Sequence, residues 1–175
     1  MYAPDQFFAC RDSFYAQPDA NWNESARYLA STPISHASQM PFTAAFFAGG
    51  TILTINGRDL NGWSETVQAE RITHTPLVPT LLYRLVEMRC RERYNFTPLR
   101  SIMYDASPMA PAALEGLIAQ FGSIFTQAYC VTETVILVSA LNTHDHDTST
   151  EVSRKRLSSV GRVTPGAGCT LSRTA

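Results

Sequence analysis

The sequence lacks the features that mark membrane-spanning, fibrous and strongly charged proteins. No apolar run reaches the roughly 18 residues needed to cross a bilayer, and the first residues carry no basic segment followed by an apolar stretch, as a signal peptide would. The 9 glycines and 10 prolines among 175 residues are too few for a collagen-like or low-complexity chain. The 14 basic and 15 acidic residues leave a net charge of −1. We therefore expect no nucleic-acid partner and no membrane span.

Cysteine is also scarce, and its spacing excludes a dense disulfide framework. The four cysteines, Cys10, Cys90, Cys130 and Cys169, are widely separated and form no CxxC metal pair. This pattern is typical of proteins in a reducing, intracellular compartment, so we expect a cytoplasmic location.

What is present suits a globular core. Hydrophobic residues make up 45% of the chain and charged residues only 17%, so the composition is not that of a disordered protein. A length of 175 residues predicts a single domain.

Short β-branched or apolar runs alternate with helical patterns along the chain. Strands are predicted over residues 27–32, 51–55, 72–78, 101–104 and 124–129, and helices within 1–25 and over 40–48, 63–70, 79–91 and 111–121. Strands separated by helices of about ten residues are typical of βαβ units. The predicted fold class is α/β, with a mainly parallel sheet and flanking helices.

The helix over 111–121 has the clearest pattern. Leu114, Leu117, Ile118 and Phe121 recur on one helical face, with proline at its start and Gly122 after its end. Leu81 and Leu85 are assigned to the core in the same way. Residues 142–156 are polar and charged, and we predict that they form a solvated loop, with residues 154–156 a solvated basic run.

Ligands of open α/β sheets sit at the carboxyl ends of the strands, which directs attention to residues 129–134. Here a hydroxyl, Thr132, and a carboxylate, Glu133, follow a strand end. Such a pair suits a Mg²⁺ ion together with substrate phosphates. On residues alone there is a simpler alternative, in which Thr132 caps the apolar segment 135–140 and Glu133 lies in its first turn.

Three of the four histidines have two interpretations. His144 and His146 alternate with Asp145 and Asp147, which predicts either a solvated loop or a metal site. His36 follows a predicted strand and is either a packed side chain or a catalytic one. His74 falls within a predicted strand, where packing or hydrogen bonding is its expected role.

Five stretches in order resemble motifs of the adenylate-forming enzymes, which include acyl-CoA synthetases, peptide-synthetase adenylation domains and luciferases. The stretches are residues 32–51, 73–82, 99–109, 125–134 and 159–166. They resemble, respectively, the family's PLxH and AGGT segments, its VPT segment, LRxxxxGAAPM, YGxTE and VGRPxPG. The resemblance runs from about residue 26 to the end of the chain, and the acyl-CoA synthetase branch looks closest.

The resemblance implies an activity and a set of roles. The family joins a carboxylic acid to ATP with Mg²⁺, forming an acyl-adenylate, and then transfers the acyl group to coenzyme A. It implies that Thr132 contacts the ATP phosphates, that Glu133 holds Mg²⁺ and that His36 lies near the activated carboxylate. The same resemblance implies that Tyr129 and Cys130 line the adenylate pocket.

The resemblance also implies that the turn formed by Asp105, Ala106, Ser107 and Pro108 passes along the adenine and the acyl pocket. Two positions in these motifs depart from the family. Asp105 and Cys130 stand where the family has glycines, and glycine at a strand end often serves a positive φ or a close approach to a ligand. Asp105 also adds negative charge near a polyanionic ligand. The departures favour an alternative function, a degenerate module that binds an acyl group or a protein without catalysis.

The family's phosphate loop, TGD motif and C-terminal domain have no counterpart in these 175 residues. We therefore expect one incomplete domain over residues 1–175 that is inactive alone. Surfaces left uncovered in such a piece predict self-association.

Overall fold

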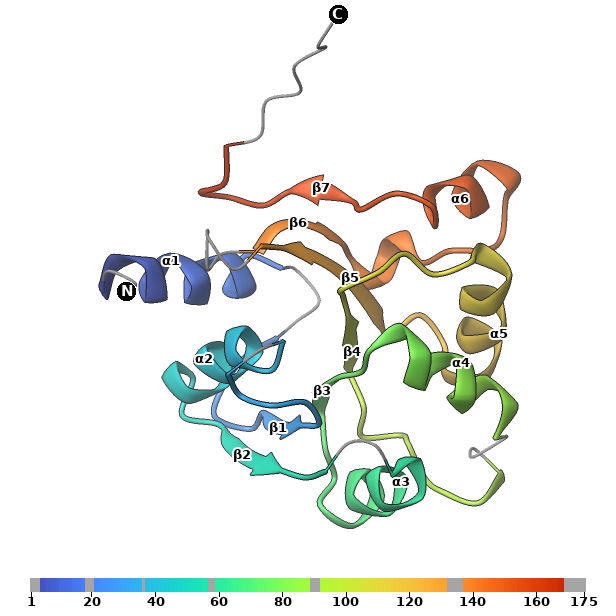
Figure 1. The fold of residues 1–175 in the computed structure, drawn as a ribbon, viewed down its shortest axis with the longest axis horizontal. Coiled ribbons are helices and arrows are strands. Elements are labelled where there is room, and N and C mark those ends of the chain that lie inside the picture. The colour runs from blue at the N-terminus through green and yellow to red at the C-terminus, as the bar shows by residue number, and fades with distance from the viewer. Residues whose placement is uncertain are drawn as a thin grey trace, which may run out of the picture.

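The computed structural model describes residues 4–17, 21–35, 37–56, 59–88, 92–131 and 137–168. Within these residues, seven strands form one sheet and six α-helices flank it (Figure 1). The strands are β1 (Arg27–Ala30), β2 (Thr51–Thr54), β3 (His74–Pro76), β4 (Ser101–Tyr104), β5 (Phe125–Cys130), β6 (Leu137–Leu141) and β7 (Arg162–Val163). The helices are α1 (Pro4–Tyr15), α2 (Gln39–Phe47), α3 (Leu60–Ala69), α4 (Pro79–Glu87), α5 (Pro111–Phe121) and α6 (Glu151–Arg156).

The sheet has the order β2-β1-β3-β4-β5-β6-β7. Strands β1 to β5 pair in parallel, while β6 runs antiparallel to β5 and β7 antiparallel to β6. The predicted mainly parallel sheet with flanking helices is thus confirmed. All five parallel strands end at one edge, which we call the carboxyl edge.

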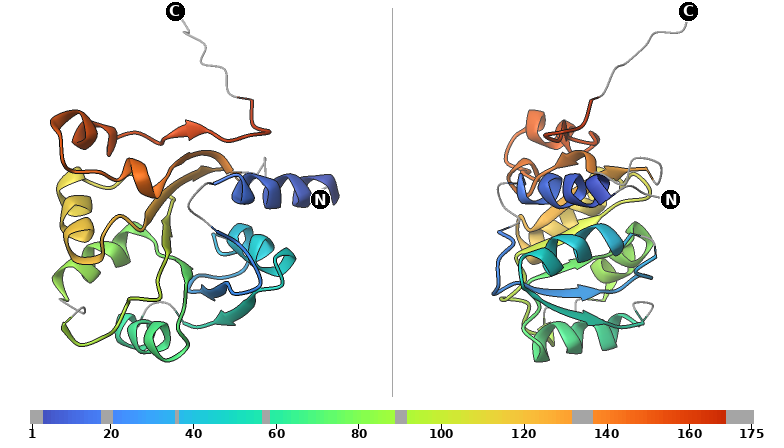
Figure 2. Two further views of the ribbon diagram at one scale, coloured as in Figure 1. Left: turned by 180° about the vertical axis from the view of Figure 1, so that it is seen from behind. Right: turned by 90° about the vertical axis from the view of Figure 1, so that its left-hand side faces the viewer.

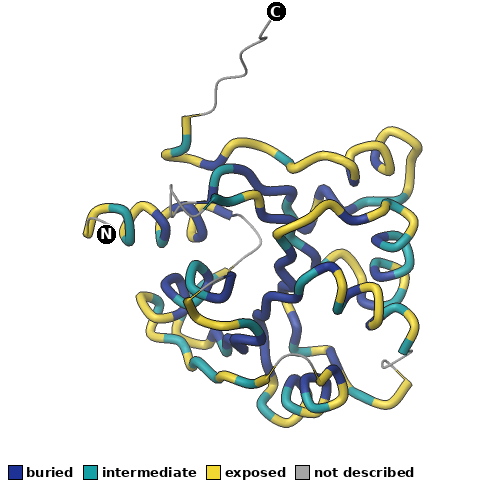
Figure 3. Tube along the Cα trace, in the orientation of Figure 1, coloured by how far each residue is buried: buried dark blue, intermediate teal, exposed yellow. Residues whose placement is uncertain are grey.

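The helices cover the two faces of the sheet unequally (Figures 1 and 2). On one face, α3, α4 and α5 pack over the larger core, which includes Trp63, Leu85, Ile102, Leu114 and Phe125. On the other face, α1 and α2 cover smaller clusters around Phe14, Tyr28, Met103 and Ala128. The continuous buried trace of the central strands lies between the layers (Figure 3).

Local signals explain where several helices begin and end. Helix α5 starts at Pro111, whose missing N–H costs nothing in a first turn, and ends at Gly122 with φ +80°. Helix α2 ends before Gly49, at φ +72°. Helix α3 starts three residues earlier than predicted because the Asp59 side chain caps it, accepting a 3.0 Å hydrogen bond from the Asn61 N–H.

The prediction of a solvated loop over residues 142–156 is wrong. A 3₁₀ turn (Thr143–Asp145) and helix α6 occupy this segment. Asp145 is 1% exposed and His146 is fully buried. The Thr150 side chain caps α6 by accepting from the Ser153 N–H at 3.1 Å. Residues 137–141 form strand β6, so the alternative of a capped helix over 135–140 is wrong for these residues.

No helix among the described residues is both long and apolar enough to cross a membrane. Cys10 and Cys130 are free thiols, as the cysteine spacing predicts.

Candidate functional site

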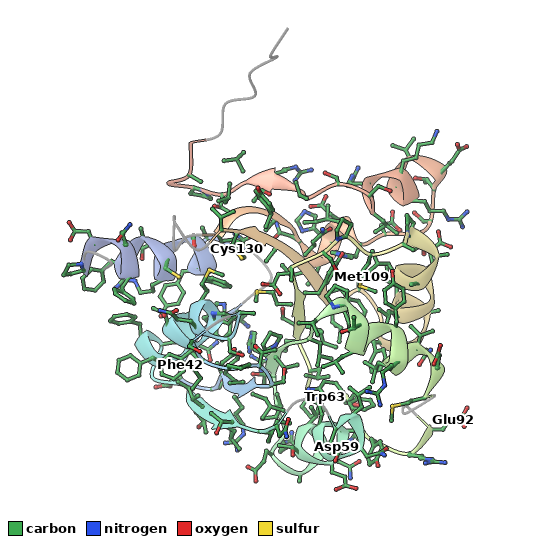
Figure 4. The ribbon with its side chains drawn as sticks, viewed as in Figure 1. Phe42, Asp59, Trp63, Glu92, Met109 and Cys130 are labelled. Carbon is green, nitrogen blue, oxygen red and sulfur yellow. The ribbon has the colours of Figure 1, made fainter. Side chains whose placement is uncertain are left out.

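The two strand-end turns that the motifs single out lie next to each other at the carboxyl edge. Strand β4 pairs with β5, with Tyr104 opposite Gln127, so Asp105 and the end of β5 continue from neighbouring strands. Figure 4 marks Cys130 close to α1. His36, Thr132 and Glu133 lie outside the described residues, so their predicted roles stay predictions.

The turn after β4 bends sharply. The Ser107 N–H donates to the Asp105 carbonyl at 2.9 Å, and Ala106 takes φ +69°. The left-handed residue is therefore Ala106. Neither Asp105 nor Cys130, the positions where the family has glycine, has a positive φ. Both positions therefore hold their side chains without a left-handed backbone, and what a side chain adds there is bulk and, at Asp105, charge.

The far side of this turn is anchored. Met109 is buried in the larger core, and the Ala110 N–H donates to the Tyr83 hydroxyl of α4 at 2.9 Å. Ala106, Ser107 and Pro108 between the anchors are exposed. The turn thus presents exposed backbone on a fixed base, as a ligand-contacting loop must.

The thiol of Cys130 donates to the Asp105 carboxylate, with Sγ 3.9 Å from Oδ2. Burial, reinforced by the negative charge of Asp105, raises the pKa of the Cys130 thiol to about 12. A thiolate is the reactive form of cysteine, so Cys130 is a protonated hydrogen-bond donor at neutral pH. Tyr129, the residue before it at the end of β5, is 47% exposed.

Below this pair, a narrow cavity of about 30 Å³ lies between the sheet and the N-terminal segment. Its lining is mostly apolar, with polar groups from several strands. The lining residues are Phe14, Gln17, Trp22, Tyr28, Pro41, His74, Thr75, Ser101, Met103, Thr126, Ala128 and Leu137.

Side-chain alternation connects this cavity to the carboxyl edge. Successive side chains of a strand point to opposite faces, so every second residue lines one face. On β4 the cavity-lining residues Ser101 and Met103 are followed in the same row by Asp105. On β5 the lining residues Thr126 and Ala128 precede Cys130; the β5–β6 register shifts between Tyr129 and Cys130, and the contact with Asp105 places the thiol on this side. The two rows end together at the Asp105–Cys130 contact.

His74 and Trp22 form one wall of the cavity. Their rings stack with centroids 4.1 Å apart and 23° between planes, and His74 Nδ1 lies 2.7 Å from the Thr73 hydroxyl. The predicted packing role of His74 is confirmed. Sequence reasoning missed Trp22, Phe14 and Met103 as lining residues. Strand alternation could have indicated Met103, whereas no local pattern places Trp22 there.

A second, open groove of about 760 Å³ lies at the same carboxyl edge. It runs over the ends of β1 and β2 and the start of α4. Hydroxyl and amide side chains alternate with apolar ones along it. The lining residues include Ser31, Thr32, Thr54, Asn56, Val78 and Thr80.

The histidines at 144 and 146 do not form a metal site. Within the described ranges, no group of three or more His, Cys, Asp or Glu side chains could hold a metal ion. His146 Nδ1 lies 2.8 Å from the Asn142 carbonyl, to which it donates, and Nε2 accepts from the Tyr104 hydroxyl at 2.9 Å. Both ring nitrogens are occupied, and His144 lies instead 3.4 Å from the buried Asp145 carboxylate.

Chemically, this edge can receive a ligand with two unlike ends. The exposed turn and the polar groove can meet a charged head group, while the cavity behind Asp105 and Cys130 can take a small apolar one. The groove, with its apolar side chains and a few placed polar groups, has the volume of a typical small-molecule site, whereas the cavity is much smaller.

Comparison with known proteins gives a consistent result. Residues 6–172 match the family described as AMP-binding enzyme. Over 143 residues the chain is 34% identical to the medium/long-chain-fatty-acid–CoA ligase FadD8 of Mycobacterium tuberculosis, covering 82% of this chain and 24% of that ligase.

Two solved structures extend the comparison to the fold. The amide bond synthetase McbA of Marinactinospora thermotolerans matches with a TM-score of 0.81 and 26% identity, over 97% of this chain and 34% of McbA. The O-succinylbenzoate coenzyme A synthetase MenE of Bacillus subtilis, solved with ATP and magnesium ion, matches with a TM-score of 0.76 and 20% identity, over 93% of this chain and 32% of MenE. The chain therefore spans about a quarter to a third of these relatives.

Proposed function

The chain belongs to the AMP-binding enzyme family, and from this premise we propose that it forms part of an ATP-dependent, AMP-forming acid–CoA ligase. The 34% identity to a fatty-acid–CoA ligase supports this choice of branch. The observation that carries it is the pair of rows on β4 and β5 that leads from the apolar cavity to Asp105 and Cys130. An acid can place its tail in the cavity and its carboxylate at the carboxyl edge.

In the proposed reaction, a carboxylate oxygen of the acid attacks the α-phosphorus of ATP and pyrophosphate leaves, giving an acyl-adenylate. The thiol of coenzyme A then attacks the acyl carbon and AMP leaves. Positioning of the reactants and neutralisation of phosphate charge dominate such chemistry. In the proposal, Thr132 contacts the phosphates, His36 lies near the carboxylate, and the backbone of residues 105–108 and Tyr129 hold the adenylate.

Glu133 is the proposed Mg²⁺ ligand. A carboxylate oxygen is a hard donor of the type that Mg²⁺ binds together with substrate phosphates, and the exposed backbone of the turn after β4 leaves room beside it for the phosphates. When bound, Mg²⁺ supplies positive charge that offsets the negative charge of the phosphates.

Because the chain spans only 24% of FadD8, the complete reaction is proposed for a protein that supplies the remaining parts. We propose that the 175 residues alone bind ligands without turnover. A pyrophosphate-release assay with ATP, Mg²⁺ and a panel of carboxylic acids tests this point, and robust turnover by the isolated chain would contradict it.

Calorimetric titration with ATP·Mg²⁺ tests the ligase proposal itself. We expect a dissociation constant of about 1 mM or tighter, lost in Glu133→Ala. Replacing Asp105 with Gly removes a negative charge and should tighten binding. Glu65→Gln, on helix α3 beneath the opposite face, is the matched control and should leave the affinity unchanged.

A second candidate function rests on the Asp105–Cys130 contact, which fills a strand-end position with a charge and a thiol. In this alternative the chain is a degenerate module that binds an acyl group or a protein without catalysis. If the wild-type chain does not bind ATP and binding does not appear even after Asp105→Gly and Cys130→Gly, the result would favour the degenerate module and overturn the ligase proposal.

We also propose self-association through aromatic side chains on α1 and α2. Phe8, Tyr15, Phe46 and Phe47 are between 41% and 62% exposed, and the Phe8 and Phe47 rings lie 5.6 Å apart. Exposed apolar patches of this kind mark association surfaces. Light scattering should show a mass that rises with concentration and a smaller rise in Phe46→Ser. A monodisperse monomer at high concentration would contradict the proposal.

A further inference from the structure

Trp22 lines the apolar cavity between the sheet and the N-terminal segment. Its ring stacks on His74 at 4.1 Å, meets Phe14 edge-on at 6.5 Å and meets Tyr28 edge-on at 6.2 Å. The space left is small, about 30 Å³. A cavity of this size has room for a few methylene-sized groups at most.

The backbone around Trp22 is also fixed. The Asn23 side chain donates to the Asn21 carbonyl at 3.0 Å and accepts from the Ser25 N–H at 2.9 Å. Asn21 itself takes φ +48°, a conformation that asparagine adopts more readily than most residues. The turn therefore fixes the backbone that carries Trp22, and moving the indole would break its three aromatic contacts.

The position of Trp22 relative to the cavity-lining residues of β4 and β5 determines how far an acyl chain can extend. An acid whose carboxylate lies at the exposed turn after Asp105 would extend its chain past Met103 and Ala128 toward the indole. Each added methylene must then occupy space that Trp22 already fills. An interior packed in this way accepts extra methylene groups only at a cost.

We infer that Trp22 sets an upper limit on the acyl chain, so that the site takes short-chain carboxylic acids and excludes medium-chain and long-chain ones. The inference rests on the proposed function, since it assumes that the acid tail enters this cavity. This expected preference for short chains differs from that of the mycobacterial relative, whose name states medium-chain and long-chain fatty acids.

Binding of sodium butanoate and sodium decanoate to the 175-residue chain tests the inference. The chain has two tryptophans, so Trp63→Phe leaves Trp22 as the fluorescent reporter of the cavity. We expect butanoate to shift the Trp22 emission saturably. Decanoate, kept below its micelle concentration, should bind at least about tenfold more weakly, a factor that roughly two buried methylene groups account for.

The second test measures by calorimetry how tightly the Trp22→Ala variant binds the same two acids. Removing the indole should tighten decanoate binding by about tenfold or more and change butanoate binding by less than about threefold. Phe46→Ala is the matched control, because Phe46 is an aromatic residue that is 62% exposed on α2 and does not line the cavity. It should leave both affinities unchanged. Trp22→Leu replaces Trp22→Ala if circular dichroism shows that the latter is unfolded.

The outcomes separate the two proposals. Equal binding of butanoate and decanoate by the wild-type chain, with a Trp22 response to both, would overturn the length limit and leave the acid site standing. Decanoate binding that is lost in Phe46→Ala would place it on the outer aromatic side chains and would also overturn the limit, since the cavity would then not be its site. No binding of either acid by the wild-type and Trp22→Leu chains would overturn the acid site and with it the inference.

Discussion

The thiol of Cys130 and the carboxylate of Asp105 meet at 3.9 Å where strands β5 and β4 end. This contact lies at the carboxyl-edge end of the β4 and β5 residues that line the cavity. It also sets the chemistry of the thiol, because the nearby negative charge and burial both oppose ionisation. A cysteine held in this way is a poor nucleophile, and its reactivity can be measured directly.

Alkylation of Cys130 should be slow at pH 8 and should rise about tenfold per pH unit until the pH approaches the pKa of about 12. Asp105→Asn removes the repulsive charge, so we expect it to lower the pKa and raise the rate at pH 8 by roughly threefold to tenfold. Iodoacetamide labelling followed by peptide mass spectrometry isolates this cysteine from the other three, and Glu65→Gln is the control. Labelling of the wild-type chain as fast as a free cysteine would contradict the prediction.

Acid should destabilise the fold through His146. Burial lowers the pKa of His146 from 6.5, so the histidine stays neutral in the folded chain while the unfolded chain takes up a proton as the pH falls. The free energy of unfolding should therefore be fully retained above about pH 6.5 and should decrease as the pH falls toward the folded pKa. Urea unfolding at pH 7.5 and 5 measures the difference, and His146→Gln should reduce it.

Tyr104→Phe tests the hydrogen bond that occupies the second ring nitrogen. Without the hydroxyl, the Nε2 acceptor of His146 is buried without its 2.9 Å donor, at a cost of about 1–2 kcal/mol in the free energy of unfolding. Tyr83→Phe, which removes a hydroxyl near the exposed Ala110, should cost less than about 1 kcal/mol. Equal effects in urea unfolding would argue against a special role for the Tyr104 bond.

Gly161→Ala should strongly destabilise the β6–β7 edge. Gly161 has φ +85°, and a Cβ there would lie 1.9 Å from the Ala140 carbonyl oxygen. Left-handed strain and backbone overlap together should cost about 3 kcal/mol or more. At Gly49, φ is +72° but a Cβ would meet nothing within 4 Å, so Gly49→Ala should cost only about 1–2 kcal/mol. Similar losses in thermal unfolding would contradict this difference.

Arg156→Gln should cost more stability than Arg154→Gln, although both arginines lie on α6. Arg156 Nη1 is 3.1 Å from Oδ1 of Asp145, whose side chain is 2% exposed. Arg154 lies 3.6 Å from Glu115, and both of those side chains are well exposed. We expect about 1–2 kcal/mol for Arg156→Gln, which weakens the compensation of a buried charge, and less than about 0.5 kcal/mol for Arg154→Gln. Unfolding in urea measures both.

The βαβ part of the fold follows from local sequence signals. Strand β4 and helix α5 have the predicted bounds, because Pro111 and Gly122 act within one turn of the helix that they delimit. The polar stretch after β6 shows the limit of such reasoning. Asp145 is buried because Arg156 and Arg162 reach it from α6 and β7, and no periodicity in the sequence records contacts over that separation.

The sequence likewise indicated some residues of the candidate site and not others. Motif resemblance directed attention to Asp105 and Cys130, which do meet at the carboxyl edge. It did not indicate that Ala106 takes the positive φ, since alanine has no preference for that conformation. It also did not indicate Trp22, whose place in the cavity depends on how α1 and the turn after it pack on the sheet.

The strand pairings of the sheet differ in how far apart the paired residues lie in the sequence, and this difference predicts the order in which the pairings form. Strands β5 and β6 are neighbours in the chain and pair antiparallel, so a short excursion brings them together. The β1–β3 junction instead joins residues 46 positions apart, as in the Arg27–Thr73 hydrogen bond, because β2 and α3 intervene. Non-local pairings are slow to form since loop closure must come first. We therefore expect the pairing of β1 with β3 to form late in refolding, and Tyr28 and His74 of these two strands then complete the wall of the cavity.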